Sequence, residues 1–514
     1  MPVAIELKLR LPPDCVTRLQ RNPLLKSLSI SRSVTQKLYS VYYDTPNFDL
    51  KQHGVALRLR RAGKHWLQTI KGGGSAALGL HQRDEWEAPV LHAQPDFTKI
   101  SEPALIKLFS ATGLREQLRP IFATEFTRSS RMLRFADGGE AQFCLDRGQI
   151  TADNASMPLC EIELELKSGS PQHLFQLALE LLHVSPLRLE NESKAQRGYL
   201  LYSGCKPQPI KAMPFALVPE MSVNTAFRAI IWNCLEHLHS NEAGMLEGRD
   251  SEYLHQMRVA LRRQRSALSI FSRVFSKAAF APVAQQLKWL AGQFGPARDW
   301  DVFATQILIP VCASFPDHPG MAALREKCEQ LRQQHNEIAR HTVESAHYAE
   351  VMLQLGAWLS TEAWLSQPNP AAPAELPKAE APVKKFATVL LAHRHRQLRK
   401  YDKELENFNV AELHALRIVA KKQRYMAEFF AGFYPPKEAR RYICCLSALQ
   451  DILGAMNDTA NAQRLLSEVA IAENESAQHE AIGIVLGWSA SLALLKKLEL
   501  ERAWMRFNKN RPFW

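Results

Sequence analysis

The chain lacks most features of an exported or membrane protein. Its nine cysteines are scattered without a Cys-x-x-Cys pair, and no Cys/His cluster has the spacing of zinc ligands, which argues against a disulfide framework and a zinc site. Charges interrupt residues 1–10, unlike a signal peptide. The apolar run without a charge at 481–495 is short for a bilayer span, and we expect a buried helix there. The sequence therefore predicts a cytoplasmic protein without a membrane span.

Positive charge, in contrast, is in excess. The 514 residues include 64 Lys and Arg against 52 Asp and Glu, a formal net charge of +12. This charge favours an anionic partner: nucleic acid, an acidic membrane face, or a phosphorylated small molecule or polymer. The hydrophobic share of 46% is typical of globular proteins, and the length exceeds what one hydrophobic core supports. We expect two or three domains.

The pattern of apolar residues changes once along the chain, which predicts a multidomain α+β protein. Residues 1–205 read mostly as strands with a helix at 172–183, and 206–220 as a proline-bearing linker. Residues 221–514 read as helices, in halves 221–365 and 383–514 around a flexible Pro/Ala-rich connector at 366–382. Alternation marks the strands at 5–10, 55–60, 66–71, 82–87, 141–146 and 160–166.

One basic segment of the helical region occurs twice. "LHQMRVALRRQR" at 254–265 returns as "LHALRIVAKKQR" at 413–424, 159 residues later, with five of twelve positions identical. At the same offset, Gly295 and Asp299 match Gly454 and Asp458. This register predicts two equivalent helical halves related by a pseudo-twofold axis.

Each copy would place a ridge of cations beside an apolar stripe, within about 80° on a helix. A solvated helix face is the simple interpretation of one such ridge. Like charges at this spacing repel, and no acid interleaves to relieve them, so two copies favour polyanion binding. The histidines could gain charge beside phosphates. The ridges consist of His255, Arg258, Arg262 and Arg265, and of His414, Arg417, Lys421 and Arg424.

These residues resemble the CHAD domain, the conserved-histidine α-helical domain. The match is H-x-x-R-x-x-x-[RK]-[RK]-x-R followed by G-x-x-[RN]-D, in both halves of about residues 220–514. The resemblance implies an all-helical, pseudo-symmetric bundle that binds inorganic polyphosphate through the eight ridge residues. The basic run at 393–400 either extends that surface or is an exposed helix face.

The predicted strands each carry one charged and one apolar face. A sheet with one face in water is the simple interpretation. However, three carboxylates alternate along 160–166 and would repel without a cation among them, while 55–60 carries arginines instead. This segregation favours a sheet closed with its charges inward, where acids hold magnesium and bases clamp phosphates. Such a site suits phosphoryl transfer.

Seven motifs in order, "IELKL", "YYDTP", "ALRLR", "TIK", "LDRG", "CEIELEL" and "SKAQRGY", resemble the CYTH domain, the triphosphate tunnel fold, over residues 1–203. The resemblance implies an antiparallel tunnel that binds triphosphates with Mg²⁺ or Mn²⁺. By position, the phosphate contacts would be Lys8, Lys37, Arg58, Arg60, Lys71, Arg83, Arg128, Lys194 and Arg197. Metal ligands would come from Glu6, Glu85, Glu87, Asp146, Glu161, Glu163 and Glu165, with Glu161, Glu163 and Lys37 in catalytic roles.

The CYTH–CHAD pair resembles bacterial inorganic triphosphatases. It implies hydrolysis of tripolyphosphate to pyrophosphate and phosphate, with polyphosphate binding by the helical domain and an association with polyphosphate granules. One departure is Ala4, where the family motif E-x-E-x-K has its first acid. Three alternatives stay open: a weak or inactive polyphosphate-binding protein, a triphosphatase for thiamine triphosphate or nucleotides, and nucleic-acid binding. The last is less favoured because the ridges lack interleaved aromatics. The sequence predicts no particular oligomeric state.

Overall fold

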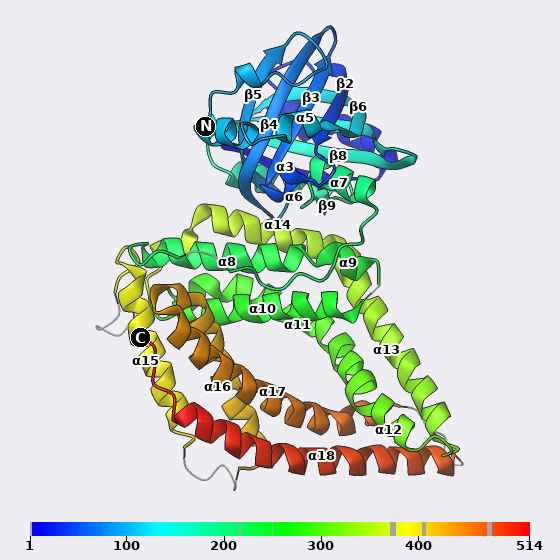
Figure 1. The fold of residues 1–514 in the computed structure, drawn as a ribbon, viewed down its shortest axis with the longest axis vertical. Helices are drawn as coiled ribbons and strands as arrows, with labels where there is room; N and C mark the ends of the chain where they lie inside the picture. The colour runs from blue at the N-terminus through cyan, green and yellow to red at the C-terminus, as the bar shows by residue number, and fades with distance from the viewer. Residues whose placement is uncertain (1–2, 215–216, 249, 371–376, 403–407, 470–474) are drawn as a thin grey trace. The chain divides into compact units, whose positions relative to one another are not determined.

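A computed structural model describes residues 3–214, 217–248, 250–370, 377–402, 408–469 and 475–514. The chain forms two compact units (Figure 1). The first contains Met1–Gln208 together with Glu344–Glu362, and the second contains Pro209–Val343 and Ala363–Trp514. The first unit therefore includes a segment that the sequence places in the helical domain.

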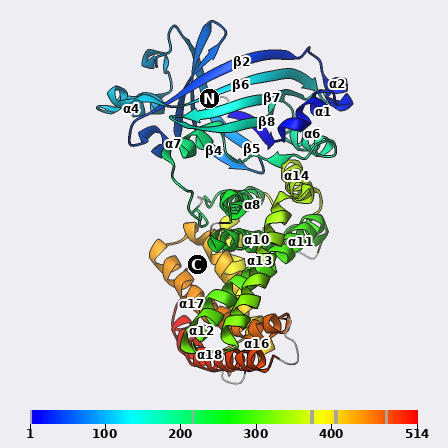
Figure 2. The ribbon, with the colours of Figure 1, turned by 90° about the vertical axis from the view of Figure 1, so that its right-hand side faces the viewer.

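The first unit is a closed antiparallel barrel, which confirms the predicted tunnel (Figure 2). Within the described residues, eight strands follow the order β5–β4–β3–β2–β6–β7–β8–β1, and pairing of β5 with β1 closes the ring. The short β9 (Arg188–Leu189) adds to β1. The strands are β1 (Val3–Arg10), β2 (Val34–Asp44), β3 (Val55–Ala62), β4 (His65–Ala77), β5 (Leu80–Val90), β6 (Arg119–Arg134), β7 (Glu140–Ala152) and β8 (Ala155–Ser168).

All six predicted strands are confirmed, and the structure adds β2, β6 and β9 to them. The predicted helix at 172–183 is confirmed as α6 (Gln172–Leu182). Further helices pack around the barrel, most of them short. They are α1 (Val16–Gln20), α2 (Pro23–Leu28), α3 (Asp49–Gln52), α4 (Pro103–Phe109), α5 (Leu114–Gln117) and α7 (Lys194–Ser203).

Helix α14 (Ala346–Thr361) completes the first unit by packing against α6. The two helices meet closely at Gly356, where an added Cβ would lie 2.2 Å from the ring of Phe175. Any larger residue at this position would have to displace a fully buried aromatic ring. Glycine here therefore permits the contact between α14 and the helix of the barrel.

The second unit is all helical, as predicted. The two copies of the repeated segment form α10 and α16, which have the same length of 21 residues and begin 159 residues apart. This match agrees with two equivalent halves. The helices are α8 (Val223–His239), α9 (Glu242–Leu246), α10 (Ser251–Phe271), α11 (Lys277–Val302), α12 (Ile309–Ser314), α13 (Met321–Glu344), α15 (Val383–Arg399), α16 (Val410–Phe430), α17 (Pro436–Ser467) and α18 (Ser476–Asn508).

The predicted flexible connector at 366–382 lies partly outside the described residues, at 371–376. Its described flanks are tied down by backbone hydrogen bonds. The amide of Asn369 donates to the carbonyl of Val274, and the amide of Val223 donates to the carbonyl of Ala381 at 3.0 Å. This strand-like pairing joins the flanks to segments distant in sequence and has no local sequence signal. Flexibility of the connector stays a prediction.

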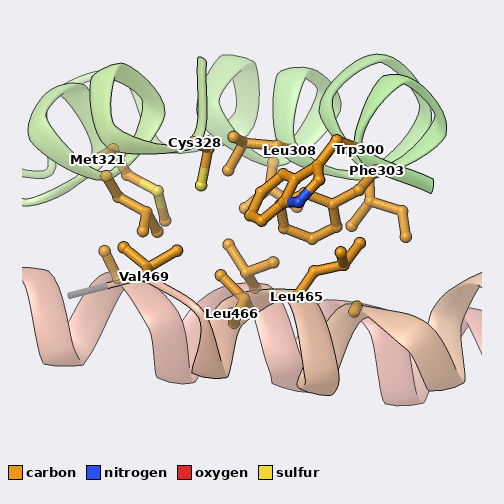
Figure 3. Packing of buried hydrophobic residues seen from close by; sticks show 14 residues of the cluster. Trp300, Phe303, Leu308, Met321, Cys328, Leu465, Leu466 and Val469 are labelled. Carbon is orange, nitrogen blue, oxygen red and sulfur yellow. The ribbon is translucent and has the colours of Figure 1, made fainter. Parts of the chain in front are cut away.

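One hydrophobic core of this unit lies between α11–α13 and α17–α18. Figure 3 shows Trp300 and Phe303 facing Leu465 and Leu466 across this core. All four side chains are almost completely buried. Helix α18 adds Ala481 and Val485, so its first half is fixed to the unit by this cluster.

The rest of α18 differs from expectation. Among the described residues it is the one helix long and apolar enough to cross a membrane by length and composition, yet only 17% of its most apolar window is buried. The prediction of a buried helix at 481–495 is wrong, since only Ala481, Val485 and Ser489 are buried there. The remaining residues of that run leave an apolar face partly or largely exposed.

Candidate functional site

Charged residues of the sequence motifs share the inward face of the barrel strands. Lys8 of β1 lies opposite Glu163 of β8. Asp146 of β7 lies opposite Glu161 in β8 and Arg128 in β6. Because side chains alternate along a strand, one register brings all of these groups to the same side of the sheet. Closure of the barrel then places acids and bases from four strands within contact of one another.

Three carboxylates form the centre of this interior cluster. Asp146, Glu161 and Glu163 offer oxygen atoms that all lie within 4.8 Å of one another. The ammonium of Lys194 lies among them, 2.7 Å from Asp146 and 3.0 Å from Glu163, and it also pairs with Glu161. A capping box at Ser193 starts α7 at this lysine and fixes its position. The protein thus supplies its own cation to a site where three acids would otherwise repel.

Two further cations, Arg128 and Lys8, add to the compensation at Asp146 and Glu163. Arg128 donates two hydrogen bonds of 2.7 Å to Asp146 and also pairs with Glu163. Lys8 pairs with Glu163. Burial alone would raise the pKa of Glu163, but Lys194, Lys8 and Arg128 lower it well below its usual range. Burial would likewise raise the pKa of Asp146, and Lys194 and Arg128 lower it. Both carboxyls are therefore ionised and able to act as oxygen ligands.

Glu6 extends the acidic cluster toward β4 and β5. Its carboxylate lies 2.5 Å from the Lys8 ammonium and 3.6 Å from that of Lys71. Lys71 is also 2.9 Å from Glu85. Burial opposes ionisation of Glu6, yet Lys8 and Lys71 lower its pKa. Lys71 thus joins Glu6 to Glu85 across neighbouring strands.

A second group of cations in the barrel has fewer acidic partners. Arg58 is buried, and its nearest carboxylate is that of Glu85 at 3.8 Å. Arg60 donates to the hydroxyl of Ser40 at 3.3 Å and forms no ion pair among the described residues. Burial, Arg58 and Arg128 lower the pKa of Arg60 to about 10. Positive potential is therefore in excess on this side of the interior, which suits an anion.

Four predicted residues lie at the margins of this arrangement. Arg197 pairs with Glu161 and so supports the central acids. Arg83 donates to the side chain of Gln196 at 3.1 Å. The other two are acids: Glu87 accepts a hydrogen bond from Thr69 at 3.0 Å, and Glu165 pairs with Lys167 at 2.5 Å.

The structure does not bring Lys37 to the interior cluster. Leu38, Ser40 and Tyr42 on the same strand are buried, whereas Lys37 is exposed on the opposite strand face. Since side chains on a strand alternate, an odd-numbered residue of β2 cannot share the interior with these even-numbered ones. A sequence signal could have shown this: Lys37 is an odd number of residues from Tyr42, the first tyrosine of "YYDTP", so the two side chains lie on opposite faces of the strand.

In the second unit, the two predicted cationic ridges converge. Helices α10 and α16 contact each other. Arg258 and Arg262 of α10 lie close enough to Arg417 and Lys421 of α16 to affect their ionisation. Burial, Arg417 and Arg262 lower the pKa of Lys421 to about 7. We call these four residues the CHAD-motif cluster.

Several donors of this cluster have no partner. Among the described residues, the Nε atoms of Arg258, Arg262 and Arg417 are buried without a hydrogen bond, and so is Nδ1 of His255. Burial and the neighbouring Arg298 lower the pKa of His255 to about 3, so this histidine is neutral in the unliganded protein. Buried donors without acceptors are costly, and these atoms are therefore free to donate to acceptor oxygens.

The other three ridge residues lie outside this cluster. His414 is exposed and shares a hydrogen bond of 3.2 Å with Asn457. Arg424 lies 3.4 Å from Glu428. Arg265 is exposed. The predicted basic run at 393–400 is a separate feature. Arg394 and Arg396 of this run lie on α15, which is neither of the two repeated helices.

Comparison with known proteins assigns both units. Residues 3–199 match the model of the CYTH domain, and residues 229–467 match the model of the CHAD domain. The chain is a CYTH domain followed by a CHAD domain. The CHAD region is similar to the crystal structure of a CHAD domain from the plant Ricinus communis, with 31% identity and a TM-score of 0.50, over 60% of this chain and 99% of that one.

Two curated relatives match different lengths of the chain. A protein of Haemophilus influenzae named inorganic triphosphatase is 32% identical over 200 residues, 39% of this chain and 55% of that protein. The chain thus spans about half the length of this relative. An uncharacterized protein of Mycobacterium tuberculosis is 25% identical over 503 residues, 93% of this chain and 91% of that one.

The CYTH domain contains functional candidates that sequence reasoning missed. Glu190 is buried and pairs with both Arg10 and Arg197, which holds Arg197 toward Glu161. Glu190 directly follows β9, and a strand of two residues is too short to show the alternation of side chains by which the sequence reveals a strand. Tyr42 faces the interior beside Arg58, and although burial raises the pKa of its phenol, Arg58 and Arg60 lower it below the ordinary value. Tyr42 could have been found from the sequence, because it lies two residues from Ser40 and therefore on the same face of the strand.

Proposed function

We propose that the chain is a metal-dependent inorganic triphosphatase that hydrolyses tripolyphosphate to pyrophosphate and phosphate. The observation that carries the proposal is the barrel interior, where three converging carboxylates lie beside a set of less compensated arginines. The named triphosphatase from Haemophilus influenzae, which matches the CYTH region, supports the same activity. The buried cations would hold the phosphate oxygens of tripolyphosphate, which carries several negative charges.

The residues present fit a hard divalent ion, Mg²⁺ or Mn²⁺. Asp146, Glu161 and Glu163 provide only oxygen donors, as these ions prefer, and their oxygens lie within 4.8 Å of one another. When bound, the ion would neutralise phosphate charge and polarise the scissile bond. Lys194 contacts the same three carboxylates, so its ammonium would have to move aside, toward the phosphates that would arrive with the ion.

The chain's own residues would divide the remaining work. Arg58 and Arg60 would bind and orient the phosphates, because they have spare hydrogen-bonding capacity on the cationic side of the interior. Lys71 would join them by exchanging its ion pairs with Glu6 and Glu85 for phosphate oxygens. Glu161 and Glu163 would position the attacking water and accept its proton. Burial in the barrel would exclude bulk water and strengthen each of these interactions.

We further propose that the CHAD domain binds inorganic polyphosphate at the CHAD-motif cluster. Arg258, Arg262, Arg417 and Lys421 come from both repeated helices and leave buried donors without acceptors. A repeating polyanion offers acceptors at regular intervals and would satisfy both helices together. This binding would associate the protein with polyphosphate granules in the cytoplasm.

Phosphate release from tripolyphosphate tests the catalytic proposal. We would measure it for the full chain with Mg²⁺, with Mn²⁺ and with EDTA, beside Glu163→Gln and a Glu140→Gln control whose ion pair with Arg134 is exposed. We expect metal-dependent release that Glu163→Gln reduces at least about 100-fold and the control leaves unchanged. No release by the folded wild-type protein would refute the proposal. Thiamine triphosphate and ATP, run in parallel, would identify a different triphosphate substrate.

A second candidate function is polyphosphate binding with little or no hydrolysis. Ala4 favours it: this residue lies opposite Arg83 in the β1–β5 pair, where the family motif has an acid. One carboxylate near Glu6 is therefore missing. Polyphosphate binding by a wild-type protein that releases no phosphate would favour this function over the first.

A further inference from the structure

Helix α18 carries an apolar face that no described part of the chain covers. The side chains of Leu494, Leu495 and Leu498 are 69%, 58% and 57% exposed. Trp488 on the same helix is 38% exposed. Exposed leucines at this density are unusual in a monomeric protein and mark an interaction surface. The question is which partner fits it.

A bilayer does not fit this face. On its other side, α18 buries Val485 in the core with Trp300, and it also buries Leu500, Trp504 and Phe507. A spanning helix would lose these contacts. Glu480 and Arg502 also lie on the exposed side, about 33 Å apart along the helix axis. The helix is therefore anchored along one side, and the other is open to a protein.

The middle of the exposed face is flat enough for a second helix to approach closely. Gly483 and Gly487 are one turn apart, and a Cβ added to either would meet no described atom within 4 Å. Ser491 lies one turn further and is exposed. Small residues at this spacing let helix axes approach, but they do not by themselves identify the partner.

The charges at the two ends of this face indicate which partner fits it. Glu480 lies at the N-terminal end of the face, with its side chain 70% exposed and a single 3.7 Å contact to His318. Arg502 lies at the C-terminal end, is exposed, and forms no ion pair among the described residues. At 100° per residue the two project within about 40° of each other, on the side that carries Leu498. One end of the face is acidic and the other basic.

This pattern is self-complementary about Ser491. If a second α18 runs antiparallel with its Ser491 opposite the first, then Glu480 faces Arg502 at both ends. Between them, Leu498 faces the half-buried Ile484 in an apolar contact, and Leu495 faces Gly487, where a large side chain meets a small one. A twofold dimer requires this property, because the same patch must match itself.

We propose that α18 is a homodimer interface, in which two copies of this chain pair antiparallel through α18 about an axis at Ser491. The inference is independent of the proposed catalytic function, since it uses no residue of the barrel or of the CHAD-motif cluster. Burial of the leucines on both copies supplies the affinity. The Glu480–Arg502 pairs at the two ends set the antiparallel direction.

The mass of the full chain in solution, by sedimentation equilibrium, tests the proposal. We expect twice the 58.2 kDa of one chain. Leu494→Asp combined with Leu498→Asp would raise the dissociation constant at least about tenfold, because two unpaired carboxylates would be buried per copy. Both residues are exposed in the monomer, so a native circular dichroism spectrum would show that the variant still folds.

Charge exchange supplies a sharper control. Glu480→Arg alone and Arg502→Glu alone would each weaken the dimer by about two- to fivefold, and the double exchange would restore it. A Ser491→Cys variant, made with the exposed Cys205 and Cys444 changed to Ser, would form a disulfide between copies. The exposed Ser467→Cys control would not.

Three results would overturn the proposal. The first is a monomeric wild-type protein at tens of micromolar. The second is a dimer that neither the leucine variant nor the charge exchanges affect. The third is a monomer that binds phosphatidylcholine–phosphatidylglycerol vesicles and loses this binding in the leucine variant, which would assign the face to lipid.

Discussion

In the barrel, buried lysines and arginines lie against carboxylates, whereas in the CHAD-motif cluster they lie mainly against one another. Lys194 touches three acids, and those acids raise its pKa although burial opposes this. Arg258 has one acid, Asp299, at 4.0 Å, and burial together with Arg262 lowers its pKa to about 10. The same residue types thus occur in a more compensated and in a less compensated setting.

The difference concerns what each site needs before a ligand arrives. In the barrel, the ion pairs offset the cost of burying these charges, so a metal and a triphosphate would have to displace existing ion pairs. The less compensated charges of the CHAD-motif cluster repel one another, so a bound polyanion would gain both its own contacts and relief of this repulsion. We expect substitutions to change stability in opposite directions at the two sites.

The largest effect is expected for Lys194→Met in the barrel. This change leaves the buried Asp146, Glu161 and Glu163 with one cation fewer, and breaking such a network typically costs about 3–5 kcal/mol. Unfolding in urea, followed by circular dichroism, would measure the loss. Lys167→Met is the matched control, because its pair with Glu165 is partly exposed and contributes about 1 kcal/mol or less. Equal stability of the two variants would contradict the compensation argument.

Arg258→Met in the CHAD-motif cluster is expected to behave differently. It removes one of several mutually repelling cations, so the unfolding free energy of the unliganded protein should stay the same or rise. Affinity for a polyphosphate of defined length should fall about tenfold, the value of one charge-assisted hydrogen bond. Calorimetric titration would measure this fall. A loss of stability like that of Lys194→Met would show that the cluster is compensated after all.

The sequence predicted these sites better than it predicted the packing around them. Alternation in "AIELKLR" identified β1, since its inward residues are charged and its outward ones apolar. In β2 the inward face mixes Leu38, Ser40 and Tyr42, so no alternation of polar and apolar residues is visible in the sequence. This segment forms a strand because β3 and β6 pair with it on either side. Helix α14 is apolar on most sides, which indicates burial but not the surface against which it is buried.

The same limit applies to individual site residues. Motif position brought Lys37 into the predicted site, although parity places it outside the barrel. Motif position also could not show that Lys194 lies among all three central acids, since this depends on how α7 meets β7 and β8. Spacing along one element was predictable, whereas contacts between elements distant in sequence were not.

A pH effect should separate the two sites further. The pKa of Lys421 is about 7 in the folded protein and 10.5 in the unfolded chain, so between these values the unfolded state binds more protons. Stability of the unliganded protein should therefore rise with pH from about 7 to about 10. Bound polyphosphate would favour the charged ammonium, which lies beside Arg258, Arg262, Arg417 and Asp458. Its affinity should therefore fall several-fold between about pH 6.5 and 8.5.

Proton uptake on binding is the direct measurement. Calorimetric titrations of polyphosphate in two buffers of different ionisation enthalpy, at about pH 8, should show uptake of a fraction of a proton per cluster. Lys421→Arg keeps the charge across this range and should abolish both the uptake and the pH dependence. Uptake that persists in Lys421→Arg would assign it to another group.

The smallest effect is expected for Ala4→Glu. Ala4 lies opposite Arg83, two residues from Glu6 on the same strand face, so a glutamate there would meet a cation and add an oxygen donor next to Glu6. We expect the Mg²⁺ concentration for half-maximal phosphate release to fall about two- to fivefold, with a smaller change in the maximal rate. Ala4→Gln adds the same length without the charge and should leave the Mg²⁺ requirement unchanged. A large gain in maximal rate would instead mean that the wild-type barrel is catalytically deficient. Lys8 and Lys71 would then neutralise Glu6 at the cost of a metal site with too few carboxylates.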